Sequence, residues 1–322
     1  MKKTDHQESD TRRIQIDKGG IGRHETFHPR YGWLKKGYDE LKKDPHIFNA
    51  PDAIERLGVG KNMVQAIRFW CSAFYLIQYE NVNGKNRKRA ELRPTILADK
   101  IFGENGWDPY LEDFGSLWLL HWNLFREPYH AVSWPLIFNY CNLSLFDAKQ
   151  LTSFLISTTK QYPKLSSISI NSFEKDASCL IRMYARPSSD TSFDIECPFG
   201  QIGLLNSGAE PKTFRFNIAT KQTLPSLIFL AASFSYVYQN QPSQRSLSLH
   251  KIVYDFNSPG VVFKISETEA GRLLDNAVSK IEGVVFVESM GNQQLQFDEE
   301  PDRLFWACLK QYYNDRSDNR ET

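Results

Sequence analysis

The stretch that decides the fold runs from Pro51 to Arg93 and reads PDAIERLGVGKNMVQAIRFWCSAFYLIQYENVNGKNRKRAELR. Pro51 suits the first turn of a short helix, because its missing N–H would have no partner there, and Asn49 can cap that helix. The helix runs through Leu57 and meets Gly58-Val59-Gly60, a break rich in residues that turn the backbone. The pattern predicts two helices joined by a short turn.

The second helix begins near Lys61 and carries apolar residues at steps of four, three, four and three. This spacing places them on one buried helix face, formed by Met63, Ile67, Trp70, Phe74 and Ile77. After the helix, LIQYE resembles a strand, Asn83-Gly84 suits a tight hairpin turn, and residues 85–93 form a basic return strand. Helix, turn, longer helix and basic hairpin predict a winged helix-turn-helix whose second helix enters a major groove.

The polar residues of this segment suit contact with DNA. On the outer helix face, Gln65 and Asn62 can pair with adenine and Arg68 with guanine, while Lys61 can lie against a phosphate. The hairpin places five cations within nine residues, as a wing along the DNA backbone requires: Lys85, Arg87, Lys88, Arg89 and Arg93. The alternative is a structural winged helix whose basic hairpin is only a solvated surface.

The whole chain is far less basic than this segment. It has 322 residues, a formal net charge of +1 and 13% aromatic residues. The length favours two or three domains, and the low net charge means that any DNA contact must be local. Five cysteines lie far apart without a Cys-x-x-Cys pair, which disfavours a disulfide framework and a zinc ribbon. Without an apolar leader or a long apolar run, we expect a cytoplasmic protein with no membrane contact.

A polar group precedes the first helix, which we expect from about residue 31 to residue 42. His24 and Glu25 are candidates for a general base, and Arg30 for a cation that binds a phosphate. The segment is also dense in aromatic residues. A packed, hydrogen-bonded N-terminal loop is therefore the simpler interpretation of the group.

Three carboxylates lie within six residues further along the chain. Asp108, Glu112 and Asp113 belong to a loop that Pro109 stiffens and aromatic residues flank. Carboxylates at such spacing can bind Mg²⁺ or Mn²⁺, hard cations that prefer oxygen ligands. The alternative is that Asp113 or a neighbour only caps the next helix.

The rest of the chain is mainly helical in pattern. Residues 95–210 hold Leu-, Phe- and Trp-rich helices, beginning with one that Thr95 can cap, and Ser172 can cap another at 173–185. Residues 211–313 include a short helix at 246–255, a helix capped by Ser266 and a hairpin around Gly291-Asn292. We predict a mainly α fold with small β-hairpins: a tail at 1–18, the winged helix at 19–94, a helical domain at 95–210, a second winged-helix-like module at 211–313 and a tail at 314–322.

Three motifs resemble a bacterial family long labelled only as a domain of unknown function. They are GRHETFHPRYGWLKKGYD, AIERLGVGKNMVQAIRFW, and GWDPYLED followed by LWLLHW. The family includes SspB of the Ssp DNA phosphorothioation system, and the resemblance covers roughly residues 20–310. It implies DNA binding with nicking of one strand, so that a sulfur-transfer enzyme and an ATPase can replace a phosphate oxygen by sulfur in anti-phage defence. It supplies no set of catalytic residues.

Two main hypotheses for function follow. The first is a nicking endonuclease in which Asp108, Glu112 and Asp113 hold Mg²⁺ or Mn²⁺, with His24 or Glu25 as base and Arg30 on the phosphate. The second is a DNA-recognition subunit without chemistry that recruits the sulfur-transfer enzymes; a dimeric transcription regulator is a third. No PD-(D/E)xK, HNH or GIY-YIG signature is present. The first hypothesis requires that the three carboxylates and His24 lie close together near the wing, whereas the second does not.

Overall fold

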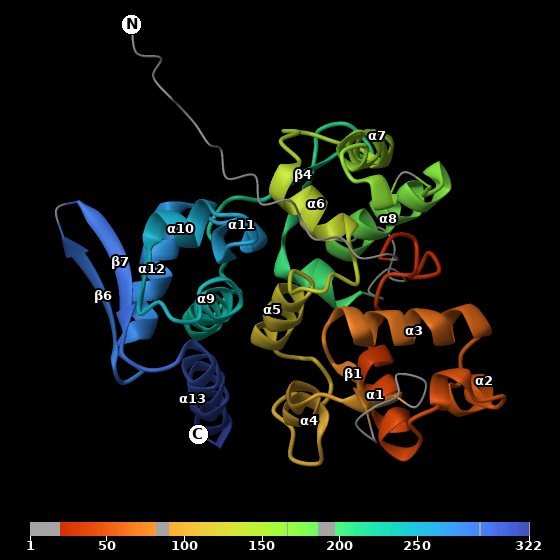
Figure 1. Ribbon diagram of the computed structural model, residues 1–322, viewed down its shortest axis with the longest axis horizontal. Helices are drawn as coiled ribbons and strands as arrows, with labels where there is room; N and C mark the ends of the chain where they lie inside the picture. Colours follow the sequence, from red (N-terminus) through yellow and green to blue (C-terminus); the bar gives the residue numbers. More distant parts are fainter. Residues whose placement is uncertain (1–19, 82–89, 166, 186–196, 290, 322) are drawn as a thin grey trace, which may run out of the picture.

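The computed structural model describes residues 20–81, 90–165, 167–185, 197–289 and 291–321. These residues form a mainly helical fold with three small antiparallel sheets. In Figure 1 the N-terminal elements lie at the lower right and the C-terminal elements at the left, with α5 between them. Among the described residues, none of the helices has both the length and the apolar character needed to cross a bilayer.

The N-terminal elements follow the predicted order of helix, turn, helix and hairpin. They are α1 (Trp33–Lys43), the 3₁₀ turn η1 (Ile47–Asn49), α2 (Ala53–Leu57), α3 (Lys61–Ala73), β1 (Ile77–Asn81) and β2 (Ala90–Pro94). Helix α1 packs against α2, α3 and β2, and the two strands pair from Ile77↔Pro94 to Asn81↔Ala90. Asn49 lies in the 3₁₀ turn, so the N-cap position of α2 falls at Asp52 and not at Asn49.

The predicted apolar stripe of α3 is buried. Ile67, Trp70 and Phe74 are fully inaccessible and Ile77 nearly so, while Met63 is half-buried at the edge. Gly37 of α1 permits the close packing beneath α3, because a Cβ there would lie 2.8 Å from both Cys71 Sγ and Ile67 Cγ2. The spacing of three and four residues therefore identified the core face correctly.

The central part is a group of helices joined by short loops. It contains α4 (Ile96–Phe102), α5 (Phe114–Asn123), α6 (Ser133–Tyr140), α7 (Ala148–Thr159), α8 (Ile170–Tyr184), two 3₁₀ turns (Pro163–Leu165 and Pro198–Ile202) and the strands β3 (Leu205–Ser207) and β4 (Phe214–Phe216). Thr95 caps α4 as predicted, whereas α8 begins earlier than predicted and is capped by Ser169 rather than Ser172. The β3–β4 pair spans residue 210, where the sequence suggested a boundary.

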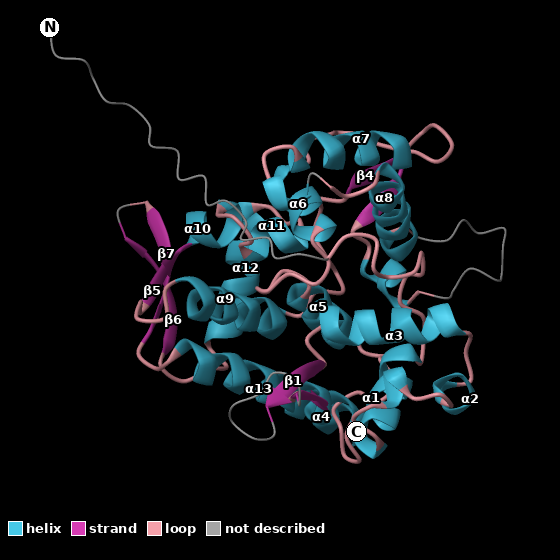
Figure 2. Ribbon diagram, turned by 45° about the vertical axis from the view of Figure 1, so that its right-hand side comes forward, coloured by secondary structure: helices cyan, strands magenta, loops and turns pink. Residues whose placement is uncertain are grey.

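The C-terminal part surrounds the apolar helix α9. It consists of α9 (Ser226–Asn240), β5 (Ser246–Ser248), α10 (Leu249–Tyr254), α11 (Pro259–Phe263), α12 (Glu267–Val278), β6 (Val284–Ser289), β7 (Asn292–Phe297) and α13 (Pro301–Glu321). The predicted hairpin β6–β7 gains β5 as a third strand, in the order β5-β7-β6, at the left edge of Figure 2. Residues 246–248 are thus a strand and not the start of a helix. Helix α13 packs on α9 and continues into the segment predicted as a tail.

Candidate nucleic-acid interface and the acidic loop

The outer face of α3 presents the four polar side chains that the sequence predicted to contact DNA. Lys61 and Asn62 are exposed in the first turn, and Gln65 and Arg68 are half-buried further along. Residues one turn apart share a helix face, so Lys61, Gln65 and Arg68 form one row. Gln65 Nε2 lies 3.5 Å from the carbonyl oxygen of Phe48, a long contact that leaves the amide able to bind elsewhere.

Arg68 is held between two neighbours. Its Nη1 donates to Asn49 Oδ1 at 3.3 Å, and its Nη2 donates to the Tyr79 hydroxyl at 2.5 Å. Tyr79 lies on β1 and is 61% exposed. The contact therefore joins the outer face of α3 to the hairpin. We call Lys61, Asn62, Gln65, Arg68 and Tyr79 the α3–hairpin surface; sequence reasoning missed Tyr79, because its partner is 11 residues away on another element.

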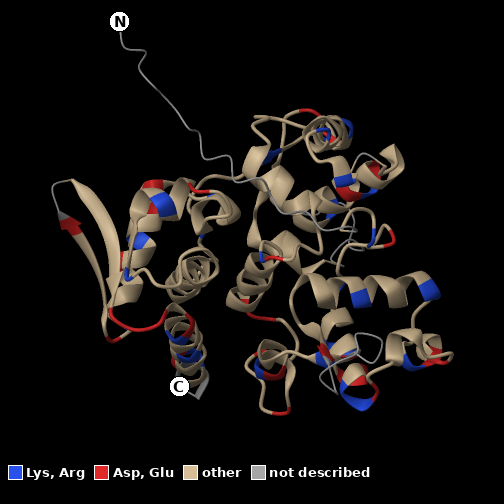
Figure 3. Ribbon diagram, in the orientation of Figure 1, with Lys and Arg blue, Asp and Glu red and all other residues tan. Residues whose placement is uncertain are grey.

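The predicted wing lies mostly outside the described residues. Lys85, Arg87, Lys88 and Arg89 fall in the 82–89 gap, whereas Arg93 is exposed on β2 and pairs with Glu91 at 2.6 Å. In the described part of the molecule, basic and acidic residues occur together on several elements, among them α1 and α13, while α3 carries only basic ones (Figure 3). The α3–hairpin surface is therefore distinguished by polar side chains on a helix beside a hairpin, and not by a uniformly basic face.

His24 lies in the core behind α3 and does not face solvent. Its Nε2 is 2.8 Å from Asp176 Oδ1, and its ring lies 6.0 Å from the Trp70 ring in a stacked arrangement. Asp176 of α8 is also fully buried, and it accepts hydrogen bonds from Gly22 N at 2.7 Å and Ser133 Oγ at 2.5 Å. The carboxylate thus ties the N-terminal loop to α6 and α8. The structure supports the packed-loop interpretation of His24.

Glu25 and Arg30 take separate positions in the same loop. Glu25 is exposed, with a φ of 51°. The Arg30 guanidinium carbon lies 5.6 Å from the Phe27 ring centroid and 5.5 Å from that of Trp33, which are distances for cation–π contact. The described hydrogen bonds of His24 lead to α8 and not to the acidic loop, so the structure does not assemble the expected catalytic group.

The acidic loop uses its carboxylates to hold its own backbone. Asp108 is buried, and its two oxygens accept from the amides of Glu112 and Asp113, each at 3.0 Å. Asp113 is buried as the N-cap of α5 and accepts from Ser116 N at 3.1 Å. Glu112 is exposed. The capping alternative is confirmed for Asp113.

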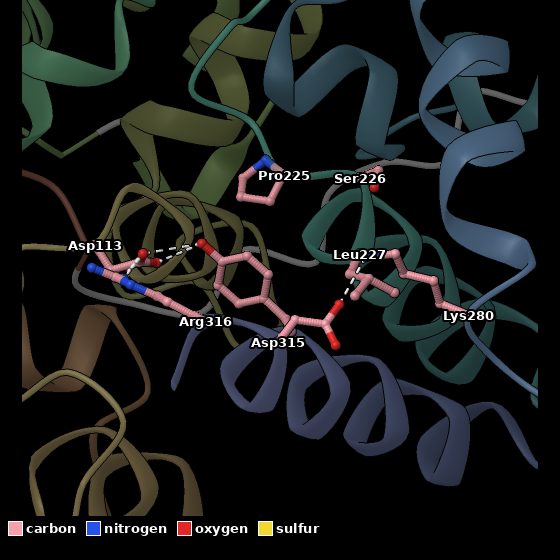
Figure 4. Close-up of a pocket in the computed structure, with 8 residues that line it drawn as sticks. Asp113, Pro225, Ser226, Leu227, Lys280, Asp315 and Arg316 are labelled. Carbon is pink, nitrogen blue, oxygen red and sulfur yellow. Dashed lines mark hydrogen bonds and ion pairs between the residues drawn. The ribbon is translucent and has the colours of Figure 1, made fainter. Parts of the chain in front are cut away.

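Asp113 also anchors the C-terminal helix. The Tyr312 hydroxyl of α13 donates to Asp113 Oδ1 at 2.8 Å, and Arg316 forms an ion pair with Oδ2. Figure 4 shows Asp113 and Arg316 at one side of a pocket of about 440 Å³, and the Lys280–Asp315 pair at the other. Both oxygens of Asp113 are therefore occupied by protein donors.

The expected magnesium site is not formed by these side chains. The oxygens of Asp108 and Asp113 accept hydrogen bonds from backbone amides and the Tyr312 hydroxyl, and Asp113 also pairs with Arg316, while Glu112 is exposed. Mg²⁺ needs several oxygen ligands that converge on one point in near-octahedral order. Across the described residues, no group of three His, Cys, Asp or Glu side chains has the geometry to hold a metal.

Comparison with known proteins gives a consistent result. A family described as "Protein of unknown function (DUF4007)" matches residues 21–313. Two solved structures, described as "SspB crystal structure" and "Magnesium ion-bound SspB crystal structure", are similar to this chain with a TM-score of 0.84 and 32% identity. Each match covers 92% of this chain and 88% of the other. A search of curated proteins returned no match.

Proposed function

The chain belongs to the DUF4007 family and resembles SspB, and from this premise we propose that it is the DNA-binding component of a DNA phosphorothioation system. In this proposal it binds double-stranded DNA and works in the cytoplasm with a sulfur-transfer enzyme and an ATPase in anti-phage defence. The observation that carries the DNA-binding role is the α3–hairpin surface. It combines exposed polar residues on a helix with a hairpin whose sequence contains four further cations.

The two halves of this surface have different roles in the proposal. In a winged helix-turn-helix, the second helix of the motif reaches base edges and the hairpin follows the phosphate backbone. Arg68 is suited to reading a base, because Asn49 and Tyr79 hold its guanidinium and reduce the freedom that it would lose on binding. Lys85, Arg87 and Lys88 are suited to phosphates, which carry no sequence information.

The experiment is a salt-dependent binding assay with labelled duplex DNA from a genomic library and from selected preferred sites. Arg68→Ala is expected to weaken binding by about 1–3 kcal/mol on preferred sites and much less on other sequences. Replacing Lys85, Arg87 and Lys88 by Ala should weaken binding to every duplex and lower the salt slope by about 0.9 per lost phosphate contact.

Lys149→Ala is the matched control, because this exposed lysine lies on α7, outside the surface. It should change neither affinity nor slope. Equal losses on all sequences for Arg68→Ala and the hairpin variant would contradict the division of roles. Unchanged binding by both variants would remove the α3–hairpin surface from the DNA interface.

A second candidate function is nicking of one DNA strand with Mg²⁺ or Mn²⁺. The observation that favours it is the similarity to a magnesium-bound SspB structure. The carboxylates of the acidic loop do not fit such an ion, so no catalytic step is assigned to them. Supercoiled plasmid should be converted to open circles with Mg²⁺ or Mn²⁺ and not with a chelator. Intact plasmid under both conditions would favour a recruiting subunit that has no chemistry of its own.

A further inference from the structure

A polar groove runs along α1. It has a volume of about 570 Å³, and its lining comes from α1, from Arg56 of α2 and from the loop at 109–111. In Figure 1, α1 lies between α2 and α4, and the loop follows α4. We call this the α1 groove.

The charge of the α1 groove is mainly positive. Its lining includes four cations, Lys35, Lys36, Lys43 and Arg56, but only two carboxylates, Asp39 and Glu40. Most of these charges are paired at the surface, with Lys35–Asp39 and Lys43–Glu40 each at 2.6 Å and Arg56–Glu40 at 3.1 Å. Arg56 also pairs with Asp44 at 2.8 Å, whereas each of the two lysine pairs joins residues of one helix near the surface and contributes little to stability, so an incoming phosphate can replace the carboxylates beside the lysines. An anionic ligand therefore matches the groove.

Lys36 shows that the groove is open to such a ligand. It is exposed and has no ion-pair partner among the described residues. Its Nζ lies 3.8 Å from the position that a Cβ would take on Gly58, in the turn between α2 and α3. The Lys36 ammonium therefore lies near the turn that leads into α3.

The rim of the groove carries two exposed aromatic rings. Tyr110 is 73% exposed and Tyr31 is 38% exposed. Tyr110 lies between Pro109 and the buried Leu111, in the loop whose next amides are bound by the Asp108 carboxylate. Leu111 N also donates to the Asp108 carbonyl at 3.2 Å. The loop thus holds a large aromatic side chain in solvent on a backbone fixed by several hydrogen bonds.

We propose that the α1 groove binds a single strand of DNA, with its phosphates on Lys36 and the neighbouring cations and its bases stacked on Tyr110 and Tyr31. Aromatic platforms combined with a basic groove are the general means of binding unpaired strands, because every base offers a π face. In duplex DNA those faces are stacked internally, which is why the rings favour a single strand over a duplex. This inference rests on the proposed DNA-binding role and specifies the form of DNA that the neighbouring site takes.

The experiment measures anisotropy of a labelled 15-nucleotide oligothymidine and of a labelled duplex with the intact protein. Tyr110→Ala is expected to weaken oligothymidine binding roughly tenfold or more, since one base loses its stacking partner. Lys36→Ala should lower the single-strand salt slope by about 0.7. Both side chains are exposed, so neither change removes core contacts. Tyr254→Ala, at an exposed tyrosine at the end of α10, is the control and should leave binding unchanged.

The outcomes separate this proposal from the proposed function. Loss of single-strand binding in Tyr110→Ala with duplex binding kept, and the reverse pattern in Arg68→Ala, supports both. Single-strand binding that needs Tyr110 in a protein that binds no duplex supports the groove and contradicts the α3–hairpin proposal. Single-strand binding that is unchanged by both Tyr110→Ala and Lys36→Ala overturns the groove. Competition by polyglutamate as strong as by oligothymidine also overturns it, because the groove would then select only negative charge.

Discussion

Replacement of Asp113 tests whether the acidic loop supports the fold or takes part in chemistry. In the structure, the carboxylate caps α5 through Ser116 N and also binds Tyr312 and Arg316 of α13. Asp113→Ala removes all three contacts. The cap contributes about 0.5–2 kcal/mol, and a hydrogen bond to a charged group about 1.5–3 kcal/mol. Because such terms are not additive, we expect a total loss of about 3 kcal/mol in the free energy of unfolding.

The variant Asp113→Asn separates the contribution of the helix cap from that of the negative charge. Asparagine is as good an N-cap as aspartate, so Asp113→Asn should keep the contact with Ser116 N and lose only the charge that faces Arg316. The expected cost is about 1–2 kcal/mol. Glu112→Ala is the matched control, because this carboxylate is adjacent in sequence but exposed, and its removal should stay within about 0.5 kcal/mol. Urea unfolding followed by tryptophan fluorescence measures all three variants.

Two results would refute this reasoning. If Asp113→Ala unfolds at the same urea concentration as the Glu112→Ala control, Asp113 does not anchor α13. If Asp113→Asn is fully stable and binds DNA but cannot nick plasmid that the wild-type protein nicks, the carboxylate has a catalytic role that the structure does not show. Nicking that survives in all three variants would remove Asp113 and Glu112 from the chemistry.

Two further predictions concern the buried core. Trp70→Ala should lower the free energy of unfolding by about 3–5 kcal/mol, because the ring is fully buried and its Nε1 donates to the Phe27 carbonyl at 2.9 Å. A stable variant that lost only DNA binding would contradict this. Burial lowers the pKa of His121 from 6.5 to about 3, so its contribution to stability is complete above pH 6.5 and is lost as the pH falls below that value. Between pH 7 and pH 5, the free energy of unfolding of the wild-type protein should fall by about 2 kcal/mol more than that of His121→Gln. Urea unfolding at each pH measures both values, and equal decreases would show that the pKa of His121 is not lowered.

The sequence was informative where the signal is local. The stripe of α3 repeats every three or four residues, so periodicity alone identified Ile67, Trp70 and Phe74 as core. Thr95 and Ser266 were recognised as caps because a cap depends on amides within three residues. Helix positions and the core face of α3 could therefore be predicted without tertiary information.

The missed features depend on partners far away in the chain. Asp176, which binds His24, is 152 residues from it, and Tyr312 is 199 residues from Asp113. Strand β5 has only three residues and is defined by its pairing with β7, about 48 residues later, so its sequence alone looked like the first turn of α10. No pattern within one segment carries such information, because the energy of each contact comes from the packing of separate elements.

The acidic loop shows why carboxylates close together in sequence do not define a metal site. Asp108 accepts one amide on each oxygen, Asp113 caps α5 and Glu112 is exposed, and among the described residues the three carboxylates form no group that could hold a metal. Pro109 and the positive φ of Leu111 bend the chain so that these amides point at the carboxylate. The same bend leaves Tyr110 in solvent, at the rim of the α1 groove. The residues that first suggested an ion therefore fix an aromatic ring in place, which is the property that a stacking platform for unpaired bases requires.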